Sequence, residues 1–544
     1  MKWNIENQPI SFPKKIREIY DEIYHRNRIF YCEWIQKLTK DKYTNLDWWM
    51  TRPTLRNPYT SNLINYITVF ETLKKIKTKD LEIVTNSKKM GLLLNKYFSR
   101  KFNLVIKYES KMKNNKILII FKSFLFQIFI FTYLKLFIKK NKINPKNKIT
   151  LIDTFITINE SLNLGFYPPL KNKKKNEILF APTIFQSFKL FKLTRNIKKQ
   201  SLKNFIFKEH YLSFYNLFYA FCYIFRRKKF LSNKYYFKNY NLSEIVNEEI
   251  LSYQNFNSIV TGILNYKFFE NISSLNLNVC KSVNWFENQV IDRGWNLGFR
   301  TFYKSFEKNS FGYQNFTRHY NLISFSPSKF EYLSKVTPYK IITISKYFKS
   351  VVKEFYKKQS VVLGPTSRFK NSKGLKKFTL KKKEGILLVL SGIYKIDKAL
   401  VKLVTETCNN NHNLSIIVKE HPIMPLKKIT SFRQMPENFK PVNGNLNLLL
   451  KKSLMTIISG PTSAILESYY MNNILILPNI EVGTKINAAR LKIDKGKFFV
   501  VENENELSKS INYIKKNKFK LLNRGLKNFD FFEELNKNNI KIFN

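Results

Sequence analysis

The segment that decides the fold is IISGPTSAILESYYMNNILILPN, residues 457–479. Residues 454–458 are short, apolar and rich in β-branched side chains, which predicts a buried parallel strand. The Gly-Pro pair at 460–461 ends this strand, and Thr462 or Ser463 can cap the helix that follows. Backbone N–H groups at a helix start can bind an anion. The turn is therefore either an ordinary strand–turn–helix crossover or a phosphate-binding loop.

The same alternation of apolar strands and helical patterns extends to both sides of this segment. It predicts an α/β protein of two Rossmann-like, doubly wound domains that face a cleft. The N-terminal domain is expected over 1–340, with helical or amphipathic insertions at about 110–145 and 186–270. The C-terminal domain is expected over 341–520, and residues 521–544 are predicted to form a helix that packs back on the N-terminal domain.

The composition is strongly basic. The 544 residues include 95 Lys and Arg against 38 Asp and Glu, a net charge of +57. Such a balance usually indicates nucleic acid or an anionic membrane as partner. Because the lysines are spread along the whole chain, no specific nucleic-acid site is predicted. The four cysteines are far apart and fit no metal spacing, and the N-terminus has no apolar signal segment, so a cytoplasmic location is expected.

Two segments are unusually apolar. Residues 117–138 (ILIIFKSFLFQIFIFTYLKLFI) are long enough to span a bilayer but contain Lys122 and Lys135. Residues 214–231 are rich in aromatic side chains and end in a basic cluster. Both segments fit either an interfacial helix at an anionic membrane or a buried core helix, and a transmembrane span is disfavoured by the internal lysines.

The chemically distinctive residues of the C-terminal domain follow predicted strands. They are Ser391-Gly392, His421-Pro422 and the 459–463 turn. In open parallel sheets, ligands bind at the carboxyl ends of strands, so these turns are expected to share one site. His421 can donate a hydrogen bond to a phosphate oxygen, and Lys419 can add positive charge.

VKEHP (418–422) and SGPTSAILE (459–467) together resemble the HP and Ser/Thr motifs of bacterial GT-B glycosyltransferases. These include sialyltransferases and capsular Kdo transferases, which use CMP-sugars, and the related glycerophosphotransferases of teichoic acid synthesis. The resemblance implies that His421 and the hydroxyl-bearing turn hold the donor phosphate, and that Glu467 accepts hydrogen bonds from the ribose. The expected donor-binding residues are Ser391, Gly392, Lys419, His421, Pro422, Ser459, Gly460, Thr462, Ser463 and Glu467.

Three N-terminal stretches resemble a group of uncharacterised bacterial surface-carbohydrate biosynthesis proteins. They are NLDWWMTRPTLRNPYTS (45–61), WFENQVIDRGWNLGFR (285–300) and GYQNFTRHYNLISFSPSKFE (312–331). The resemblance indicates a pathway rather than a substrate.

Inverting transfer requires a group that takes the proton of the acceptor hydroxyl. The candidate bases are Glu287, Asp153 and Asp47, and Arg52, Arg56 and Gln314 are candidates for binding the acceptor. Each has a structural alternative, such as an ion pair of Glu287 with Arg293 or Arg300. No Asp-x-Asp pair follows a strand, so neither a metal nor another cofactor is expected, and positive groups would offset the leaving phosphate.

The sequence thus favours a glycosyltransferase of bacterial surface polysaccharide biosynthesis. It would move a sugar from a CMP-linked rather than a UDP-linked donor to a glycan or lipid-linked acceptor, by metal-independent inverting displacement. An anionic membrane surface is an expected partner, with the protein peripheral at the inner face of the cytoplasmic membrane. Two alternatives are a CDP-glycerol-type glycerophosphotransferase and a non-catalytic basic protein that binds membrane or nucleic acid.

Overall fold

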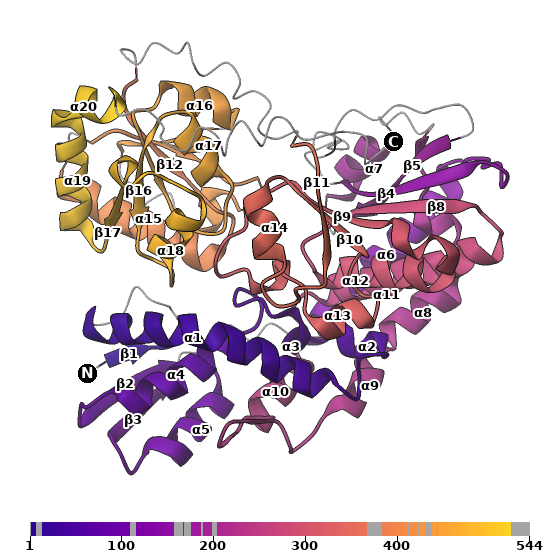
Figure 1. Cartoon of the computed structure of the whole chain (residues 1–544), viewed down its shortest axis with the longest axis horizontal. Helices are drawn as coiled ribbons and strands as arrows, with labels where there is room; N and C mark the ends of the chain where they lie inside the picture. The colour runs from indigo at the N-terminus through magenta and orange to yellow at the C-terminus, as the bar shows by residue number, and fades with distance from the viewer. Residues whose placement is uncertain are drawn as a thin grey trace.

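The strands among the described residues lie in three parallel sheets and one short antiparallel pair. The computed structural model describes residues 2–6, 14–108, 116–156, 167, 176–185, 189–198, 204–366, 383–411, 414–422, 424–429, 437–442 and 444–523. Figure 1 shows the N-terminal unit (indigo and purple) and the C-terminal unit (orange and yellow) on one side, and the middle unit on the other. Each unit contains one of the three parallel sheets.

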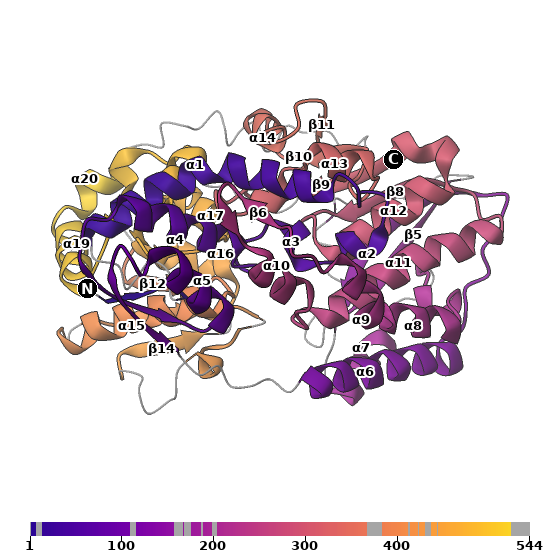
Figure 2. The same cartoon turned by 90° about the horizontal axis from the view of Figure 1, so that it is seen from below.

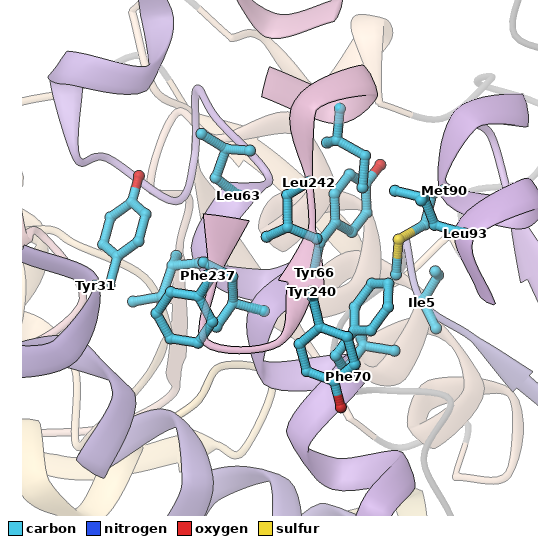
Figure 3. Close-up of a cluster of buried hydrophobic side chains, with 14 of the residues drawn as sticks. Ile5, Tyr31, Leu63, Tyr66, Phe70, Met90, Leu93, Phe237, Tyr240 and Leu242 are labelled. Atoms are coloured by element: carbon cyan, nitrogen blue, oxygen red, sulfur yellow. The ribbon is translucent and has the colours of Figure 1, made fainter. Parts of the chain in front are cut away.

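The N-terminal unit has the strand order β1-β2-β3. Its elements are β1 (Lys2–Asn4), α1 (Lys14–Thr39), α4 (Leu63–Lys75), β2 (Asp80–Thr85), α5 (Lys88–Phe98) and β3 (Asn103–Tyr108). Aromatic side chains fill the core, where the rings of Phe70 and Tyr240 lie 4.7 Å apart (Figure 3). Tyr240 belongs to a hairpin of β6 (Tyr236–Phe237) and β7 (Tyr240–Asn241), so this distant segment completes the N-terminal core.

The middle unit has six parallel strands in the order β11-β10-β9-β8-β4-β5. The strands are β4 (Lys148–Ile156), β5 (Asn176–Ile184), β8 (Val279–Trp285), β9 (Ser310–Gln314), β10 (Lys340–Thr343) and β11 (Ser360–Leu363). Leu151 packs into one core and its neighbour Ile152 into another, because successive side chains of a strand point to opposite faces. Strand order reverses between β4 and β8, so the crevice at their carboxyl ends is the switch point of this sheet.

Helices cover both faces of the middle sheet. They are α6 (Lys116–Phe137), α7 (Leu190–Lys198), α8 (Phe214–Phe221), α9 (Tyr223–Arg226), α11 (Phe256–Ser274), α12 (Val290–Phe302) and α14 (Lys346–Val352). Three short helices, α2 (Leu46–Trp49), α3 (Arg52–Leu55) and α10 (Ser243–Ile250), connect this unit with the N-terminal one, and α13 (Lys329–Leu333) follows the loop after β9.

The C-terminal unit also has six parallel strands, in the order β14-β13-β12-β15-β16-β17. The strands are β12 (Ile386–Val389), β13 (Ile416–Lys419), β14 (Phe439–Val442), β15 (Met455–Ile458), β16 (Ile474–Pro478) and β17 (Phe498–Val501). The covering helices are α15 (Tyr394–Asn409), α16 (Leu446–Lys452), α17 (Ala464–Tyr470), α18 (Thr484–Arg490), α19 (Glu504–Lys516) and α20 (Lys518–Asn523). This is the Rossmann order 3-2-1-4-5-6, whose switch point lies between β12 and β15.

The predicted fold class is confirmed: the chain is an α/β protein with two Rossmann-like parallel sheets in a GT-B-like arrangement. The carboxyl ends of the two large sheets meet, since the segment after β9 bonds to the loop after β15 through Thr317 and Ser463. The sequence did not predict the separate N-terminal sheet.

The structure also differs from the predicted boundary at residue 341. Strand β10 pairs with β9, and β11 pairs with β10, so the middle sheet runs to Leu363 and the C-terminal sheet begins at Ile386. The sequence of an apolar parallel strand does not indicate which sheet the strand joins, so the boundary between the two sheets was predicted too early in the chain. Part of the predicted insertion, α11, is a core helix that packs on α12.

The predicted C-terminal helix falls almost wholly outside the described residues. Its first residues, Leu521 and Leu522, belong to α20 and are buried in the core of the C-terminal unit, not against the N-terminal part of the chain.

Candidate functional site

The loops after β12, β13 and β15 touch one another at the switch point of the C-terminal sheet. Gly392 has φ +86° and Gly460 has φ +94°, a region that favours glycine. A β-carbon on Gly460 would lie 2.8 Å from Cβ of Ser391, and one on Gly392 would lie 2.6 Å from Nδ1 of His421. The structure therefore brings together three turns that the sequence placed at one edge, and glycine is required at two of them.

The turn after β12 is closed by an acidic side chain. The backbone N–H groups of Ser391 and Gly392 donate to the carboxylate of Asp397 at 2.7 and 2.8 Å, and the Ser391 hydroxyl donates at 2.8 Å. Asp397 is fully buried, and burial raises its pKa. Ser391 and Gly392 were expected to bind the nucleotide sugar. Their N–H groups and the Ser391 hydroxyl already donate hydrogen bonds to Asp397, so in this structure the two residues shape the turn.

The hydroxyls of the opening turn are also engaged. The Ser463 hydroxyl accepts from the backbone N–H of Thr317 and lies 3.2 Å from the Thr317 hydroxyl, in the middle unit. The Thr462 hydroxyl accepts from the backbone N–H of Ala464 at 3.2 Å, and the Ser459 hydroxyl donates to Pro478. The turn is thus neither a simple helix cap nor an open phosphate-binding loop, because the Ser463 hydroxyl is hydrogen-bonded to Thr317 of the middle unit.

The other expected donor-side residues surround this crossing point. His421 is half-buried beside Gly392, and exposed Pro422 follows it as the chain leaves β13. Lys419, the last residue of β13, donates to the carbonyl of Glu420. Glu467 is half-buried on α17, one turn beyond Ser463. Their proposed contacts with a nucleotide stay predictions.

A small cavity of about 10 Å³ lies beside the turn, between the C-terminal and middle units. Ser459 and Gly460 line it together with His319, Glu481 and Asn487. His319 follows β9 of the middle unit, whereas Glu481 follows β16 of the C-terminal unit. The pocket is therefore built by strand ends of both large sheets.

An acid–imidazole pair forms the polar wall of this pocket. Nε2 of His319 lies 3.1 Å from Oε2 of Glu481, and the Tyr59 hydroxyl donates to Oε1 at 3.0 Å. Burial raises the pKa of Glu481 to about 8, and the nearby charge of Asp397 adds to the effect. Burial lowers the pKa of His319 to about 3, with Arg490 contributing. At neutral pH both groups are uncharged, and Nδ1 of His319 accepts from the backbone N–H of Asn321 at 3.3 Å, so both ring nitrogens have protein partners.

The sequence patterns did not single out His319 or Glu481. His319 lies inside the quoted stretch 312–331, and Glu481 comes directly after the strand ILILP. The rule that polar residues after parallel strands form the site would have found both, because each follows a strand by a few residues.

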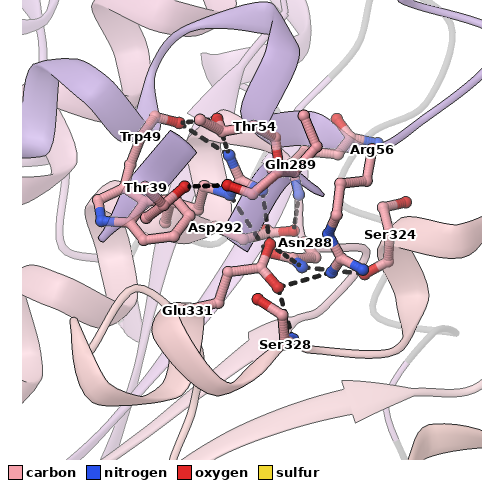
Figure 4. Close-up of polar contacts among 12 residues, drawn as sticks. Thr39, Trp49, Thr54, Arg56, Asn288, Gln289, Asp292, Ser324, Ser328 and Glu331 are labelled. Atoms are coloured by element: carbon pink, nitrogen blue, oxygen red, sulfur yellow. Dashed lines mark hydrogen bonds and ion pairs between the residues drawn. The ribbon is translucent and has the colours of Figure 1, made fainter. Parts of the chain in front are cut away.

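The N-terminal acceptor-binding candidates prove to be structural. Arg56 is buried, donates to Glu331 at 2.6 Å and to the carbonyl of Ser326 at 2.9 Å (Figure 4). Arg52 pairs with Glu249 at 3.0 Å. Gln314 is fully buried.

The side-chain oxygen of Gln314 accepts from Arg318 at 2.6 Å, and its amide donates to the carbonyl of Phe325. Burial is the physical reason for these corrections, since a buried guanidinium or amide must be paired. The candidate base Asp47 is likewise buried and pairs with Arg226 at 2.9 Å and Lys229 at 3.5 Å.

The two remaining candidate bases lie near the switch point of the middle sheet. Asp153 is fully buried within β4, where burial raises its pKa to about 7 while Lys208 opposes the rise. Glu287 follows β8, is half-buried, and accepts from Trp285 Nε1 at 2.9 Å and from Gln289 at 2.6 Å. The alternative ion pairs of Glu287 do not form, because Arg293 pairs with Glu331 and Arg300 with Glu307. Glu287 stays a candidate base, whereas Asp153 is buried beyond the reach of an acceptor.

Among the described residues, no group of three or more His, Cys, Asp or Glu side chains could hold a metal ion.

Comparisons with known proteins give distant structural similarity only. No family model and no curated protein matches the chain. The UDP complex of MnaA from S. aureus covers 72% of this chain and 91% of its own, at 12% identity and a TM-score of 0.38. UDP-GlcNAc 2-epimerase from Neisseria meningitidis, bound to UDP-GlcNAc, covers 72% and 98% at 13% identity and a TM-score of 0.39. UGT89C1 from Arabidopsis thaliana, complexed with UDP, covers 73% and 100% at 9% identity and a TM-score of 0.39.

Proposed function

We propose that the protein is a nucleotide-sugar-dependent glycosyltransferase of bacterial surface polysaccharide biosynthesis. One observation carries the proposal: three strand-end turns of a Rossmann-ordered sheet meet at its switch point, beside a pocket whose other wall is the His319–Glu481 pair. Switch-point crevices are where sheets of this kind bind nucleotides. The donor would lie on the C-terminal unit, with its phosphate near His421.

Glu287 stays the candidate for the group that takes the proton of the acceptor hydroxyl. His319 lines the same pocket as Ser459 and Gly460, but Nδ1 accepts from the backbone N–H of Asn321 at 3.3 Å and burial lowers its pKa to about 3, so it is a weak base that shapes the pocket. Glu481 contacts Nε2 and so fixes the ring orientation. The acceptor, a glycan or lipid-linked glycan, would approach from the side of the middle unit. The transfer would be an inverting displacement in which positive and dipolar groups, rather than a metal, offset the leaving phosphate.

The donor must enter while the two units are apart. Ligand pockets usually have volumes of about 300–1,000 Å³, whereas the present cavity of about 10 Å³ is far too small for a nucleotide, and the bonds of Ser463 with Thr317 join the two units beside it. A Thr317→Cys, Ser463→Cys double variant can test this, since the replaced hydroxyl oxygens lie 3.2 Å apart. Oxidation should abolish nucleotide binding and a reductant should restore it, while each single variant should bind under both conditions.

The defining experiment is a thermal-shift panel of CMP, CDP, UDP and GDP. We expect CMP to raise Tm most, and His421→Ala to remove the shift. CMP-sugars, CDP-glycerol and UDP-GlcNAc should then be offered with and without acceptor glycans. Release of CMP only with acceptor supports sugar transfer. Turnover of CDP-glycerol would indicate glycerophosphotransfer, and acceptor-independent conversion of UDP-GlcNAc would indicate an epimerase. A panel without any shift, together with salt-sensitive binding of random nucleic acid, would replace the proposal with the non-catalytic alternative.

A further inference from the structure

The middle unit exposes a large aromatic and basic surface, here called the α6–α8 surface. It consists of α6 and the segment 214–231, which contains α8 and α9. Large apolar side chains on it that are at least about one-third exposed are Ile117, Leu118, Phe121, Phe124, Leu125, Leu136, Phe137, Phe214, Tyr215, Phe218, Phe225 and Leu231. Exposed apolar side chains scattered singly need no explanation, but a contiguous set marks a binding surface.

The two segments form one surface. The rings of Phe131 and Phe214 lie 4.7 Å apart, and those of Phe124 and Phe221 lie 5.1 Å apart. Lys135 Nζ, near the end of α6, donates to the carbonyl of Leu212 at 2.8 Å. Figure 2 shows α6 and α8 side by side along one edge of the molecule.

The inner side of α6 is fixed to the body of the protein. Ser123 and Gln127 bond to Asn257 of α11 at 3.1 and 2.8 Å, and Ile130 and Leu134 are buried. By length and composition, α6 is the one helix among the described residues that could cross a membrane. A third of its most apolar 18-residue stretch is nevertheless buried in the protein. A helix bound along one side and exposed along the other suits a position in the plane of an interface.

The charge of the surface indicates its partner. Residues 116–142 and 211–231 contain no Asp or Glu. Exposed lysines accompany the apolar side chains: Lys122, Lys135, Lys139, Lys140, Lys142, Lys228 and Lys229. A second copy of the chain would set these lysines against one another, so self-association through this surface is unfavourable. A partner that is both apolar and anionic is a bilayer with acidic phospholipids.

We propose that the α6–α8 surface docks the protein on an anionic membrane, with α6 and α8 lying flat among the headgroups. The aromatic rings enter the acyl boundary and the lysines contact lipid phosphates. Docking would make the protein peripheral at the cytoplasmic face, where a lipid-linked acceptor is available. The surface does not depend on the identity of the donor, so docking can hold even if the proposed transfer fails.

The test is flotation of the full chain with vesicles of phosphatidylcholine alone or mixed with phosphatidylglycerol. We expect flotation with the anionic vesicles only, and its loss at high salt. A Lys122→Ala, Lys228→Ala variant should lower the partition constant about 25-fold, from about 1 kcal/mol per basic residue. Phe121→Ser, Phe218→Ser should lose binding while retaining Tm, because both side chains are already exposed.

The matched control is Tyr513→Ser, Phe519→Ser, which removes two exposed aromatic side chains from the C-terminal unit. This control should float like the wild type. Equal recovery of soluble protein with and without anionic vesicles would overturn the proposal. So would a loss of flotation in the control variant equal to that of Phe121→Ser, Phe218→Ser. Concentration-dependent dimerisation that Phe121→Ser, Phe218→Ser abolishes, without any flotation of the wild type, would identify the surface as a contact between copies instead.

Discussion

Glu331 joins two buried arginines in one hydrogen-bond network. Its two oxygens accept from Arg56 at 2.6 Å, Arg293 at 2.9 Å, Asn288 at 3.0 Å and the backbone N–H of Ser328 at 2.7 Å. Burial alone would raise the pKa of Glu331, but the two guanidinium groups outweigh it and hold the pKa below its ordinary value. Figure 4 shows how these side chains converge from separate segments.

The substitution Glu331→Gln should therefore be severely destabilising. It leaves two buried guanidinium groups without a counter-charge, and the new amide can accept at only one end. Removing one partner of a buried pair costs about 3–5 kcal/mol. With an unfolding entropy of about 2.1 cal/mol/K per residue, a cooperative unit of about 350 residues should lose about 4–7 °C in Tm.

Differential scanning calorimetry at pH 7 measures this change. The matched control is Glu22→Gln, which breaks the exposed pair with Lys75 and should cost less than about 1 kcal/mol. If Glu331→Gln lowers Tm no more than the control does, the two arginines are stabilised by something other than this carboxylate.

Two further predictions concern the pocket and the turn beside it. Between pH 6.5 and 8, the raised pKa of Glu481 makes its stabilising contribution fall as pH rises, by about 2 kcal/mol, and the loss of the remaining charge of His319 in the unfolded state offsets only a small part of this fall. Tm should decline over this range, and Glu481→Gln should flatten the decline; an unchanged slope would contradict the assignment. Gly460→Ala should lower Tm and CMP affinity more than Gly385→Ala. Gly385 also has a positive φ, but a β-carbon there would meet nothing within 4 Å. Equal losses would show that the contact of a β-carbon on residue 460 with Ser391 is unimportant.

Much of the C-terminal unit could be predicted from the sequence. Apolar runs such as ILLV and MTII stop at glycine or proline, and strand ends in one parallel sheet share an edge, so the meeting of Gly392, His421 and Gly460 follows from the pattern. What could not be predicted was which polar groups would already be satisfied. The bond of Ser463 to Thr317 joins residues 146 positions apart, and no local pattern reports it.

The N-terminal candidates illustrate the same limit. Arg56 and Asp47 have the residue types of an acceptor site, but their partners, Glu331 and Arg226, lie far along the chain. A charged side chain in a sequence carries no sign of whether it will be buried and paired or exposed to a ligand. Only the packing of distant segments decides between the two.

The long separation within the buried network has a consequence for synthesis of the chain. Arg56 precedes Glu331 by 275 residues. At about 5–20 residues per second, a ribosome needs about 14–55 s to make the partner after the arginine has emerged. Throughout that interval Arg56, buried in the finished protein, lacks its counter-charge. The chain therefore cannot bury Arg56 in its final environment until residue 331 leaves the ribosome, and fragments that end earlier should be less stable than the full chain.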